Sequence, residues 1–457
     1  MCKFKKKVIL YCKLSPVKVK RCYFITQSKG FYCPFQCPSP LSITANSPFF
    51  LHTEPNMQFS DLPEHLAMPA LRSFQAWPIS KDKKQFVALR DPYALVRETM
   101  VVPAHLFGVI KRIDGNTLAK DIAASTKAPE DQFIDLLEKL DASGLLWGPT
   151  SAKLEQDTVA RLTEDGTFPI RASGSLGKTT EDCKKQLQQW FSETEDPEFE
   201  QAIRGIVAPH LDYVRGWPNY ASAYYAWQTA EKPDRIVILG TNHFGEGDGV
   251  VLSTIGFTSP LGHCPVDTAV VDCLLAAFGE GVLKDLIDHA AEHSIELQLP
   301  WIQHCFGNVP VVAALIPNPL IDMLDGDEDN SRTTTDEFIS ELKKILEELG
   351  GTTYVVASAD LSHVGQQFGE PRPVDDQRKY DVERHDREMM TKFIGNDTED
   401  FVSSMKWHNN STNWCSIGNM SAAVNLLEPN QIELIDYRQA CDSKGAALVS
   451  SCAMALL

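Results

Sequence analysis

The sequence predicts an α/β protein in which a mainly parallel or mixed central sheet is flanked by helices, preceded by a small winged-helix-like α+β domain. Short apolar segments such as 235–239 contain several β-branched residues and are typical of strands buried on both faces. Helix-length stretches alternate with these segments, and such alternation indicates a sheet covered by helices. Residues 57–150 follow a different order, helix, helix and strand, and form the smaller predicted domain.

Charge and hydropathy exclude two classes of partner. The chain has 457 residues, enough for two or three domains, and a net charge of -18 at pH 7. Such an acidic chain does not favour nucleic-acid binding, which depends on clustered Lys and Arg. No apolar run approaches the roughly 20 residues that a membrane-spanning helix needs. We therefore expect neither nucleic acid nor a membrane as a partner.

The first 56 residues differ in composition from the rest of the chain. They contain nine Lys and Arg against the single Glu54, and hence carry a net charge of +8. They also hold five of the 12 cysteines. We predict that residues 1–56 are a disordered or non-native extension and that translation starts at Met57. The intact mass of the native protein would then exclude residues 1–56.

The remaining cysteines indicate a cellular compartment. They are scattered singly through the chain after Met57, and none has a CxxC spacing. This pattern fits reduced thiols better than a disulfide framework, and reduced thiols are typical of cytoplasmic proteins. We therefore expect a cytoplasmic location.

Residues 57–150 have the order of elements expected of a winged-helix-like module. Apolar residues recur at helical spacing in two segments, the second of which also carries four acidic side chains. Because DNA binding requires cations that replace condensed counterions, we expect this module to bind a protein or peptide and not DNA. The predicted elements are a strand at 100–103, helices at 117–123 and 130–142, and a strand at 144–147.

A polar linker, 151–164, leads into the α/β domain, 165–457. A first amphipathic helix is expected at 183–191, and apolar strands then alternate with helices. The strands are predicted at 205–209, 235–240, 249–253, 309–316, 353–358 and 431–437. The helices are predicted at 217–230, 267–279, 293–306, 335–349, 376–394, 397–406 and 416–427.

Three of these strands run into polar residues that can carry chemistry. In open α/β sheets, ligands bind at the edge formed by the carboxyl ends of the strands. A single histidine at a strand end is usually a polar tip that reaches solvent, but three strands that repeat the pattern weaken that interpretation. The residues at these ends are His210, His243, Asp360 and His363.

Two further segments contain candidate residues. Glu292 and Glu296 fit the start of a helix as capping residues, whereas His293 between them has no such explanation. Cys415 lies near the start of a helix of small residues, where the helix dipole favours a thiolate; a buried, inert cysteine is the alternative. Histidines with a thiolate suit a first-row transition metal, and three protein ligands with an open position are typical of catalytic sites. Spacing alone does not select the ligands.

Six separated motifs occur in an order that resembles the MEMO family, called protein B of the AmmeMemoRadiSam system. The resemblance covers about residues 165–457 and implies a fold similar to LigB-type class III extradiol dioxygenases. Residues 57–150 resemble, more weakly, the PqqD-like module of some bacterial members. The motifs are Ala208–Tyr213, Leu239–His243, Ser259–Gly262, Glu292–Glu296, Ser358–His363 and Cys415.

The resemblance implies roles for individual residues. By motif, the metal ligands are His210, His243 and Cys415. The other pocket positions of the family fall on His293, Asp360 and His363. The sequence departs from the family pattern at Ser416, where a glycine is common, and at Ser259, where the family has threonine. Neither change removes an implied ligand.

Three hypotheses for function follow. The first is a redox enzyme that uses Fe(II), or Cu, on a peptide or small-molecule substrate, with His293 or His363 as acid and base and Asp360 orienting an imidazole. The family's association implies a radical SAM protein and an AMMECR1-like protein as partners. The second is a non-catalytic scaffold that binds a peptide or protein in the dioxygenase-like cleft. The third is hydrolysis by a Cys415, His363 and Asp360 triad, although no nucleophile-elbow motif is present.

Overall fold

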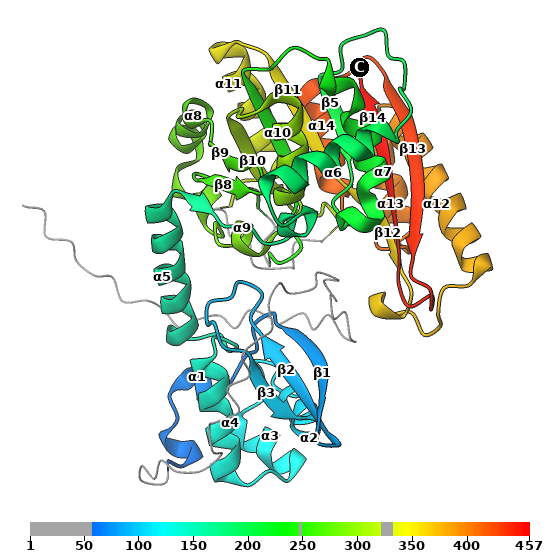
Figure 1. Ribbon diagram of the computed structural model, residues 1–457. Helices are drawn as coiled ribbons and strands as arrows, with labels where there is room; N and C mark the ends of the chain where they lie inside the picture. Colours follow the sequence, from blue (N-terminus) through cyan, green and yellow to red (C-terminus); the bar gives the residue numbers. More distant parts are fainter. Residues whose placement is uncertain (1–56, 246–248, 321–331) are drawn as a thin grey trace, which may run out of the picture.

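The computed structural model describes residues 57–245, 249–320 and 332–457. The predicted extension 1–56 lies outside these residues. An eight-stranded mixed sheet forms the centre of the larger domain, and a small α+β module lies beside it (Figure 1). The predicted fold class is therefore confirmed.

Four neighbouring strands of the large sheet are parallel and buried except at the first residues of two of them. They are β5 (Gly205–Ala208), β11 (Thr353–Ser358), β6 (Arg235–Thr241) and β10 (Val311–Ile316), in that spatial order. β7 (Val251–Leu252) pairs antiparallel with β10 at one edge. The other side of the sheet is formed by β12 (Asp360–Val364), β13 (Ile432–Cys441) and β14 (Leu448–Leu456).

β14 joins β12 and β13 to the parallel part of the sheet. One of its edges pairs with β13 along its whole length, and its other edge pairs first with β12 and then with β5, always antiparallel. The sequence prediction did not include β14, and it placed Asp360 and His363 directly after a continuous strand. Instead the strand is interrupted at Ala359, and both residues belong to β12, which pairs with β14.

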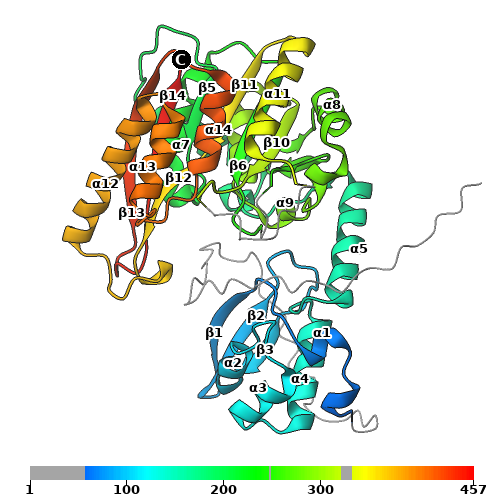
Figure 2. The same ribbon diagram turned by 180° about the vertical axis from the view of Figure 1, so that it is seen from behind.

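Side chains of each buried strand alternate between two hydrophobic cores. Ile236 and Ile238 belong to one core, whereas Val237 and Leu239 belong to the other. The first core is covered by α6 (Thr180–Ser192), α7 (Tyr213–Tyr224), η3 (Tyr225–Gln228) and α10 (Leu299–Phe306). The second is covered by α8 (Thr268–Phe278), α11 (Thr335–Leu349), α12 (Asp376–Ile394), α13 (Thr398–Trp407) and α14 (Ile417–Leu427). Figures 1 and 2 show the two helical layers from opposite sides.

Most predicted helices have the expected bounds, but the one at 293–306 is wrong at its start. Residues 293–295 are not helical, a 3-10 turn η5 (Glu296–Gln298) follows, and α10 begins at Leu299. The Glu292 side chain accepts hydrogen bonds from the backbone N–H groups of His293 (2.7 Å) and Ser294 (2.9 Å), which holds these residues in a loop. The smaller elements nearby are α9 (Asp288–Ala291), η4 (Gly279–Leu283), η6 (Gln366–Phe368), η2 (Ser173–Leu176), β4 (Thr167–Phe168), β8 (Gly256–Ser259) and β9 (Gly262–Cys264).

The N-terminal module has its own hydrophobic core, formed by residues between Leu62 and Leu146. Its sheet contains β1 (Gln75–Lys81), β2 (Lys84–Arg90) and β3 (Met100–Pro103), all antiparallel, with η1 (Phe59–Asp61), α1 (Glu64–Ala67), α2 (Ala104–Ile110), α3 (Ala119–Thr126) and α4 (Glu130–Ala142). The strand predicted at 144–147 is wrong, because only a single bridge joins Leu71 and Leu146 there.

The segment between the module and the large domain is helical. α5 (Pro149–Asp165) begins with a proline, whose fixed φ suits the first turn, and ends at Gly166 with a left-handed φ of 65°. The predicted linker, 151–164, lies within this helix. In both ribbon views α9 and β12 lie on the side of the large domain that faces the β1–β3 sheet (Figures 1 and 2).

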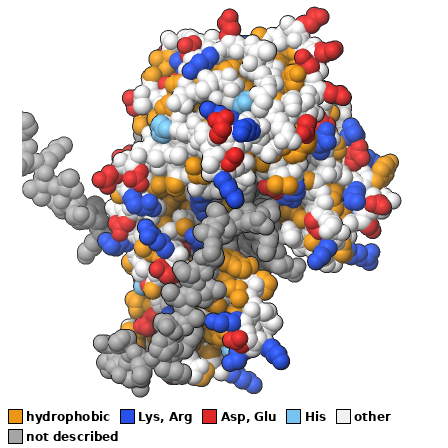
Figure 3. All heavy atoms as spheres, in the orientation of Figure 1, with side chains coloured by type: hydrophobic (Ala, Val, Ile, Leu, Met, Phe, Trp, Pro, Cys, Tyr) orange, Lys and Arg blue, Asp and Glu red, His pale blue; other side chains and the backbone are white. Residues whose placement is uncertain are grey.

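The surface of the large domain carries charges of both signs. Acidic and basic side chains are interspersed over the face of the large domain in Figure 3. Among the described residues, no helix combines the length and hydrophobicity required to cross a bilayer. The seven cysteines in this part of the chain are free thiols.

Candidate metal centre

The parallel strands bring three of the predicted residues to one edge of the sheet. β5, β11 and β6 are direct neighbours, so the residues that follow them lie side by side. His210 follows β5 after Pro209, His243 follows β6 after Asn242, and Asp360 follows β11 after Ala359. The ring centroids of His210 and His243 are 5.0 Å apart.

His210 is buried and held from two sides. Its backbone N–H donates to Asp360 Oδ1 at 2.9 Å, and its Nδ1 lies 3.0 Å from the carbonyl oxygen of Ser358. A carbonyl oxygen only accepts, so this contact places the proton on Nδ1 and leaves the Nε2 lone pair free in the neutral ring. Burial, then the neighbouring His243 and His293, hold the pKa of His210 well below its usual value. The ring is therefore a neutral nitrogen donor.

His243 is oriented by a buried carboxylate. Glu292 lies 3.0 Å from His243 Nδ1 through Oε1 and accepts the His243 backbone N–H through Oε2 at 2.8 Å. This contact fixes the Nδ1–H tautomer and leaves Nε2 as the ligand atom, an arrangement common around metal-binding histidines. Burial alone would raise the pKa of Glu292, but the charges and hydrogen bonds of His243 and His293 hold it well below its usual value.

Cys415 approaches the histidines from the loop before α14. Its Sγ lies 3.4 Å from His210 Nε2 and 3.2 Å from the Oγ of Ser416, whose hydroxyl also contacts Thr241 Oγ1 at 3.0 Å. The sequence prediction that the helix start lowers the thiol pKa is wrong for the metal-free chain. Burial dominates and raises the pKa of Cys415, so a thiolate here requires a nearby cation.

Two overlapping groups of side chains have metal-binding geometry. In each group one ligand atom per residue lies within 4.8 Å of the others. The first group is His210, His243 and Cys415, and the second is His243, Glu292 and His293. Five N–H groups, including one from each imidazole, already contact the Glu292 carboxylate. Its oxygens are therefore less available to a metal than the ligand atoms of the first group.

His293 lies beside both His210 and His243. Its ring stacks on His243 at 4.9 Å and lies 5.5 Å from the ring of His210. Burial would lower the pKa of His293, but the Glu292 carboxylate, 3.1 Å from His293 Nδ1, raises it above its usual value. His293 therefore carries a proton more readily than a free imidazole does.

Asp360 and His363 complete the rim from β12. Burial raises the pKa of Asp360 to about 6, although the hydrogen bond from the His210 backbone lowers it. Burial lowers the pKa of His363 to about 4, and its Nδ1 lies 3.0 Å from the carbonyl oxygen of Leu361. The hydrolase hypothesis paired Cys415 with His363, but the histidine that contacts the Cys415 sulfur is His210.

The sequence interpretation missed the role of both glutamates. Glu292 does cap the local backbone, yet it also orients His243, which lies 49 residues away. Glu296 accepts hydrogen bonds from the backbone N–H groups of Arg171 (2.8 Å), Ala172 (3.0 Å) and Ser173 (3.0 Å), and so anchors a distant segment instead of its own helix. The signal available in the sequence was that Glu292 and Glu296 lie on either side of His293.

A close approach of backbone supports this arrangement. A Cβ placed on Gly240 would meet the Ser294 hydroxyl at 2.6 Å, so only glycine lets β6 lie this close to the segment after His293. The Ser294 hydroxyl then donates to the carbonyl of Thr241 at 2.9 Å. The histidines of the two segments are thereby held side by side.

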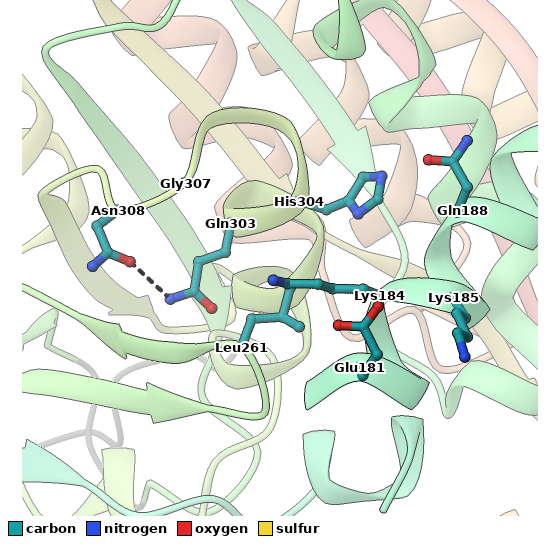
Figure 4. Close-up of a pocket in the computed structure, with 9 residues that line it drawn as sticks. All are labelled: Glu181, Lys184, Lys185, Gln188, Leu261, Gln303, His304, Gly307 and Asn308. Carbon is teal, nitrogen blue, oxygen red and sulfur yellow. Dashed lines mark hydrogen bonds between the residues drawn. The ribbon is translucent and has the colours of Figure 1, made fainter. Parts of the chain in front are cut away.

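A separate surface pocket of about 580 Å³ lies away from these residues. Figure 4 shows its lining, which comes from α6, from α10 and its end, and from Leu261. It contains none of the residues of the candidate metal centre. Its charged lining residues carry both signs and are Glu181, Lys184 and Lys185. Burial, followed by the charge of Lys184, lowers the pKa of His304.

Comparison with known proteins identifies relatives of the large domain. The sequence profile described as Memo-like protein matches residues 170–455. A MEMO1 family protein of Aquifex aeolicus is 25% identical over 351 residues, which cover 75% of this chain and 87% of the relative. MEMO1 family proteins of Methanopyrus kandleri (30% identical, 53% of this chain and 78% of the relative) and Thermococcus kodakarensis (28%, 58% and 90%) are also similar.

Proposed function

The chain belongs to the Memo-like protein family, and on that premise we propose that it binds one transition-metal ion and uses it in a redox reaction on a peptide or small-molecule substrate. The observation that carries this proposal is the convergence of His210, His243 and Cys415, whose ligand atoms lie within 4.8 Å of one another. The ion would be held by the Nε2 atoms of the two imidazoles and by the sulfur of Cys415.

The hydrogen-bond partners and the burial of the three residues suit a metal ion. Both imidazoles have an acceptor at Nδ1, Ser358 O for His210 and Glu292 for His243, which is the outer arrangement that directs Nε2 to a metal. The Cys415 thiol is buried, and its proton would leave only if a cation compensated the sulfur charge.

We propose Fe(II) as the native ion, with Cu as the alternative under copper-rich conditions. Two imidazoles and a thiolate resemble a 2-His-1-carboxylate set in which sulfur replaces the carboxylate, and the softer sulfur also suits copper. When bound, such an ion supplies one-electron redox chemistry at an open coordination position.

Residues around the open side would handle protons and orient the substrate. His293 carries a proton readily because Glu292 stabilises its charged form, so it would serve as a general acid. His363 is neutral at pH 7 and would accept or donate a hydrogen bond to the substrate. Asp360 would fix the His210 loop through the 2.9 Å bond to the His210 backbone.

The test is metal content after anaerobic reconstitution, followed by oxygen uptake. Cys415→Ser should lose most of the metal, because a serine hydroxyl is a poor ligand, whereas the matched variant His363→Ala should lose about 10–100-fold in affinity at most. Equal metal stoichiometry in wild type and Cys415→Ser would refute the ligand assignment. Metal binding without oxygen uptake on any peptide or small molecule would favour the scaffold role.

We further propose that the protein acts with a radical SAM protein and an AMMECR1-like protein. This proposal is supported only by the family resemblance of the motifs around the metal centre. Co-purification of either partner with the full chain, compared with a variant of the exposed residue Trp407, would test the interaction. Trp407 is 87% exposed at the end of α13 and is the most exposed large apolar side chain among the described residues.

A further inference from the structure

The N-terminal module reaches the metal centre through the loop between β2 and β3. Asp91 begins this loop, and its Oδ2 accepts the backbone N–H of Leu95 at 2.8 Å, which closes a tight turn. The turn presents Tyr93 to the large domain. The Tyr93 ring contacts Phe244 of that domain at 6.5 Å between centroids, while the Arg72 guanidinium lies 5.9 Å from the same ring on the module side.

The Tyr93 hydroxyl is bonded to a buried carboxylate. It donates to Asp288 Oδ1 at 2.9 Å and also lies 3.2 Å from the carbonyl oxygen of Phe244. Asp288 is 3% exposed and begins α9, four residues before Glu292. Because a buried carboxylate needs hydrogen-bond donors, loss of the Tyr93 hydroxyl would leave Asp288 with fewer partners.

Asp288 in turn holds the loop that carries His243. Its Oδ2 accepts from Asn242 Nδ2 at 2.7 Å, and Asn242 Oδ1 accepts the backbone N–H of Gly245 at 2.8 Å. Asn242 immediately precedes His243 in the chain. Burial raises the pKa of Asp288 to about 7, while the hydrogen bonds from Asn242 and Tyr93 favour its ionised form.

A second contact fixes the same turn of the module. Arg171 Nη2 donates to the carbonyl oxygen of Pro92 at 3.0 Å, and Arg171 Nη1 donates to the carbonyl oxygen of Ala290 at the other end of α9. Pro92 and Tyr93 are therefore attached to both ends of the helix that leads to Glu292 and His293. This arrangement makes the turn part of the scaffold of the metal centre, although it lies outside residues 170–455 that match the family.

We propose that Tyr93 is a positioning residue for the metal centre: its hydroxyl fixes Asp288, Asp288 fixes Asn242, and Asn242 fixes the loop that places His243. This proposal rests on the proposed function, because it assigns His243 as a metal ligand. It gives the N-terminal module a role in holding the site, in addition to any partner that the module binds.

The first test uses the metal-free full-length protein, so that it does not depend on metal binding. Tyr93→Phe retains the ring that packs on Phe244 and removes only the hydroxyl. Hydrogen exchange of the amides of residues 243–245 should become roughly 3- to 10-fold faster, the effect of losing one hydrogen bond. Tyr380→Phe is the matched control, because Tyr380 is 61% exposed on α12, and it should leave this exchange unchanged.

The second test measures anaerobic Co²⁺ affinity from the sulfur-to-cobalt absorption. Tyr93→Phe should weaken binding by about 10-fold, as is typical when a group behind a ligand is removed. Asp288→Asn acts on the other partner of the same bond, so the double variant should be no worse than Asp288→Asn alone.

The outcomes separate this proposal from the proposed function. Unchanged amide exchange in Tyr93→Phe would overturn it, and so would faster exchange with unchanged Co²⁺ affinity, since the order of the loop would then not reach His243. Additive effects of the two variants would also overturn it. If the wild-type protein bound no metal, the proposed function would fail, and faster exchange would still support the role of Tyr93 in ordering the loop.

Discussion

Replacing Glu292 with glutamine should affect both the stability of the chain and the affinity of the proposed metal centre, and the two effects can be measured separately. The carboxylate is 3% exposed and accepts hydrogen bonds from the backbone N–H groups of His243, His293 and Ser294 at 2.8, 2.7 and 2.9 Å. Its contact with His243 Nδ1 at 3.0 Å fixes the ligand tautomer. A glutamine amide has one acceptor oxygen in place of two, so its NH₂ group would face an N–H donor.

The expected magnitudes follow from these contacts. At least one buried N–H would be left without an acceptor, which costs about 1–3 kcal/mol in the free energy of unfolding. Loss of the oriented imidazole should weaken metal binding by about 10–100-fold. Glu292→Gln should lower the metal affinity more than His363→Ala does, because Glu292 directly contacts the proposed ligand His243.

The assay combines urea unfolding of the metal-free protein with a Co²⁺ titration. Glu296→Gln is the matched control: Glu296 is a buried carboxylate four residues away that accepts backbone N–H groups from Arg171, Ala172 and Ser173 but contacts no proposed ligand. It should lose similar stability with unchanged affinity. Equal losses of affinity in the two variants would show that general loosening, and not the Glu292 contact, determines metal binding.

Three further outcomes are expected. The pKa of Asp288 is raised to about 7, so the folded chain binds this proton more tightly than the unfolded chain does. The free energy of unfolding should therefore fall by up to about 4 kcal/mol as the pH rises from 4 to 7. Asp288→Asn should remove this pH dependence in urea unfolding. The buried Asp386 carboxylate accepts hydrogen bonds from the side chains of Ser362, Trp414, Tyr437 and Ser450. In urea unfolding, Asp386→Asn should lower the free energy of unfolding by about 3–5 kcal/mol, whereas Tyr437→Phe, which removes one donor, should lower it by about 1 kcal/mol. The isolated 57–150 module should show no salt-sensitive binding to duplex DNA, and micromolar affinity that falls with salt would contradict the argument from its acidic helix.

The parts of the fold that could be predicted are those with strong local patterns. The strand that leads to His243 contains four consecutive apolar residues, and the helices α11 and α12 begin at capping residues, so their bounds follow from the sequence. β14 was missed because its residues include two serines and two alanines, which have little strand propensity of their own. Its stability comes from pairing with three strands.

The candidate site was predictable in its residues and not in its electrostatics. The motifs brought forward His210, His243 and Cys415, because each histidine follows a recognisable strand and the cysteine precedes a recognisable helix. The partners of those residues come from distant segments: Glu292 reaches His243 across 49 residues, and Ser358 reaches His210 across 148. Burial, which raises the pKa of Cys415 against the helix dipole, is likewise a property of the assembled fold.

The position of β14 determines when the site can form during folding. His210 and Cys415 are 205 residues apart, and β14, which follows both of them, joins the strand of His210 to the strand of His363. Contacts so distant in sequence close large loops before they gain stabilising energy, and this slows folding. When every histidine of the nascent chain has been synthesised, β14 is still missing, so the sheet is incomplete. Until β14 pairs with β5 and β12, the proposed ligands would hold a metal ion only loosely. Binding of the proposed ion should therefore follow synthesis and not accompany it.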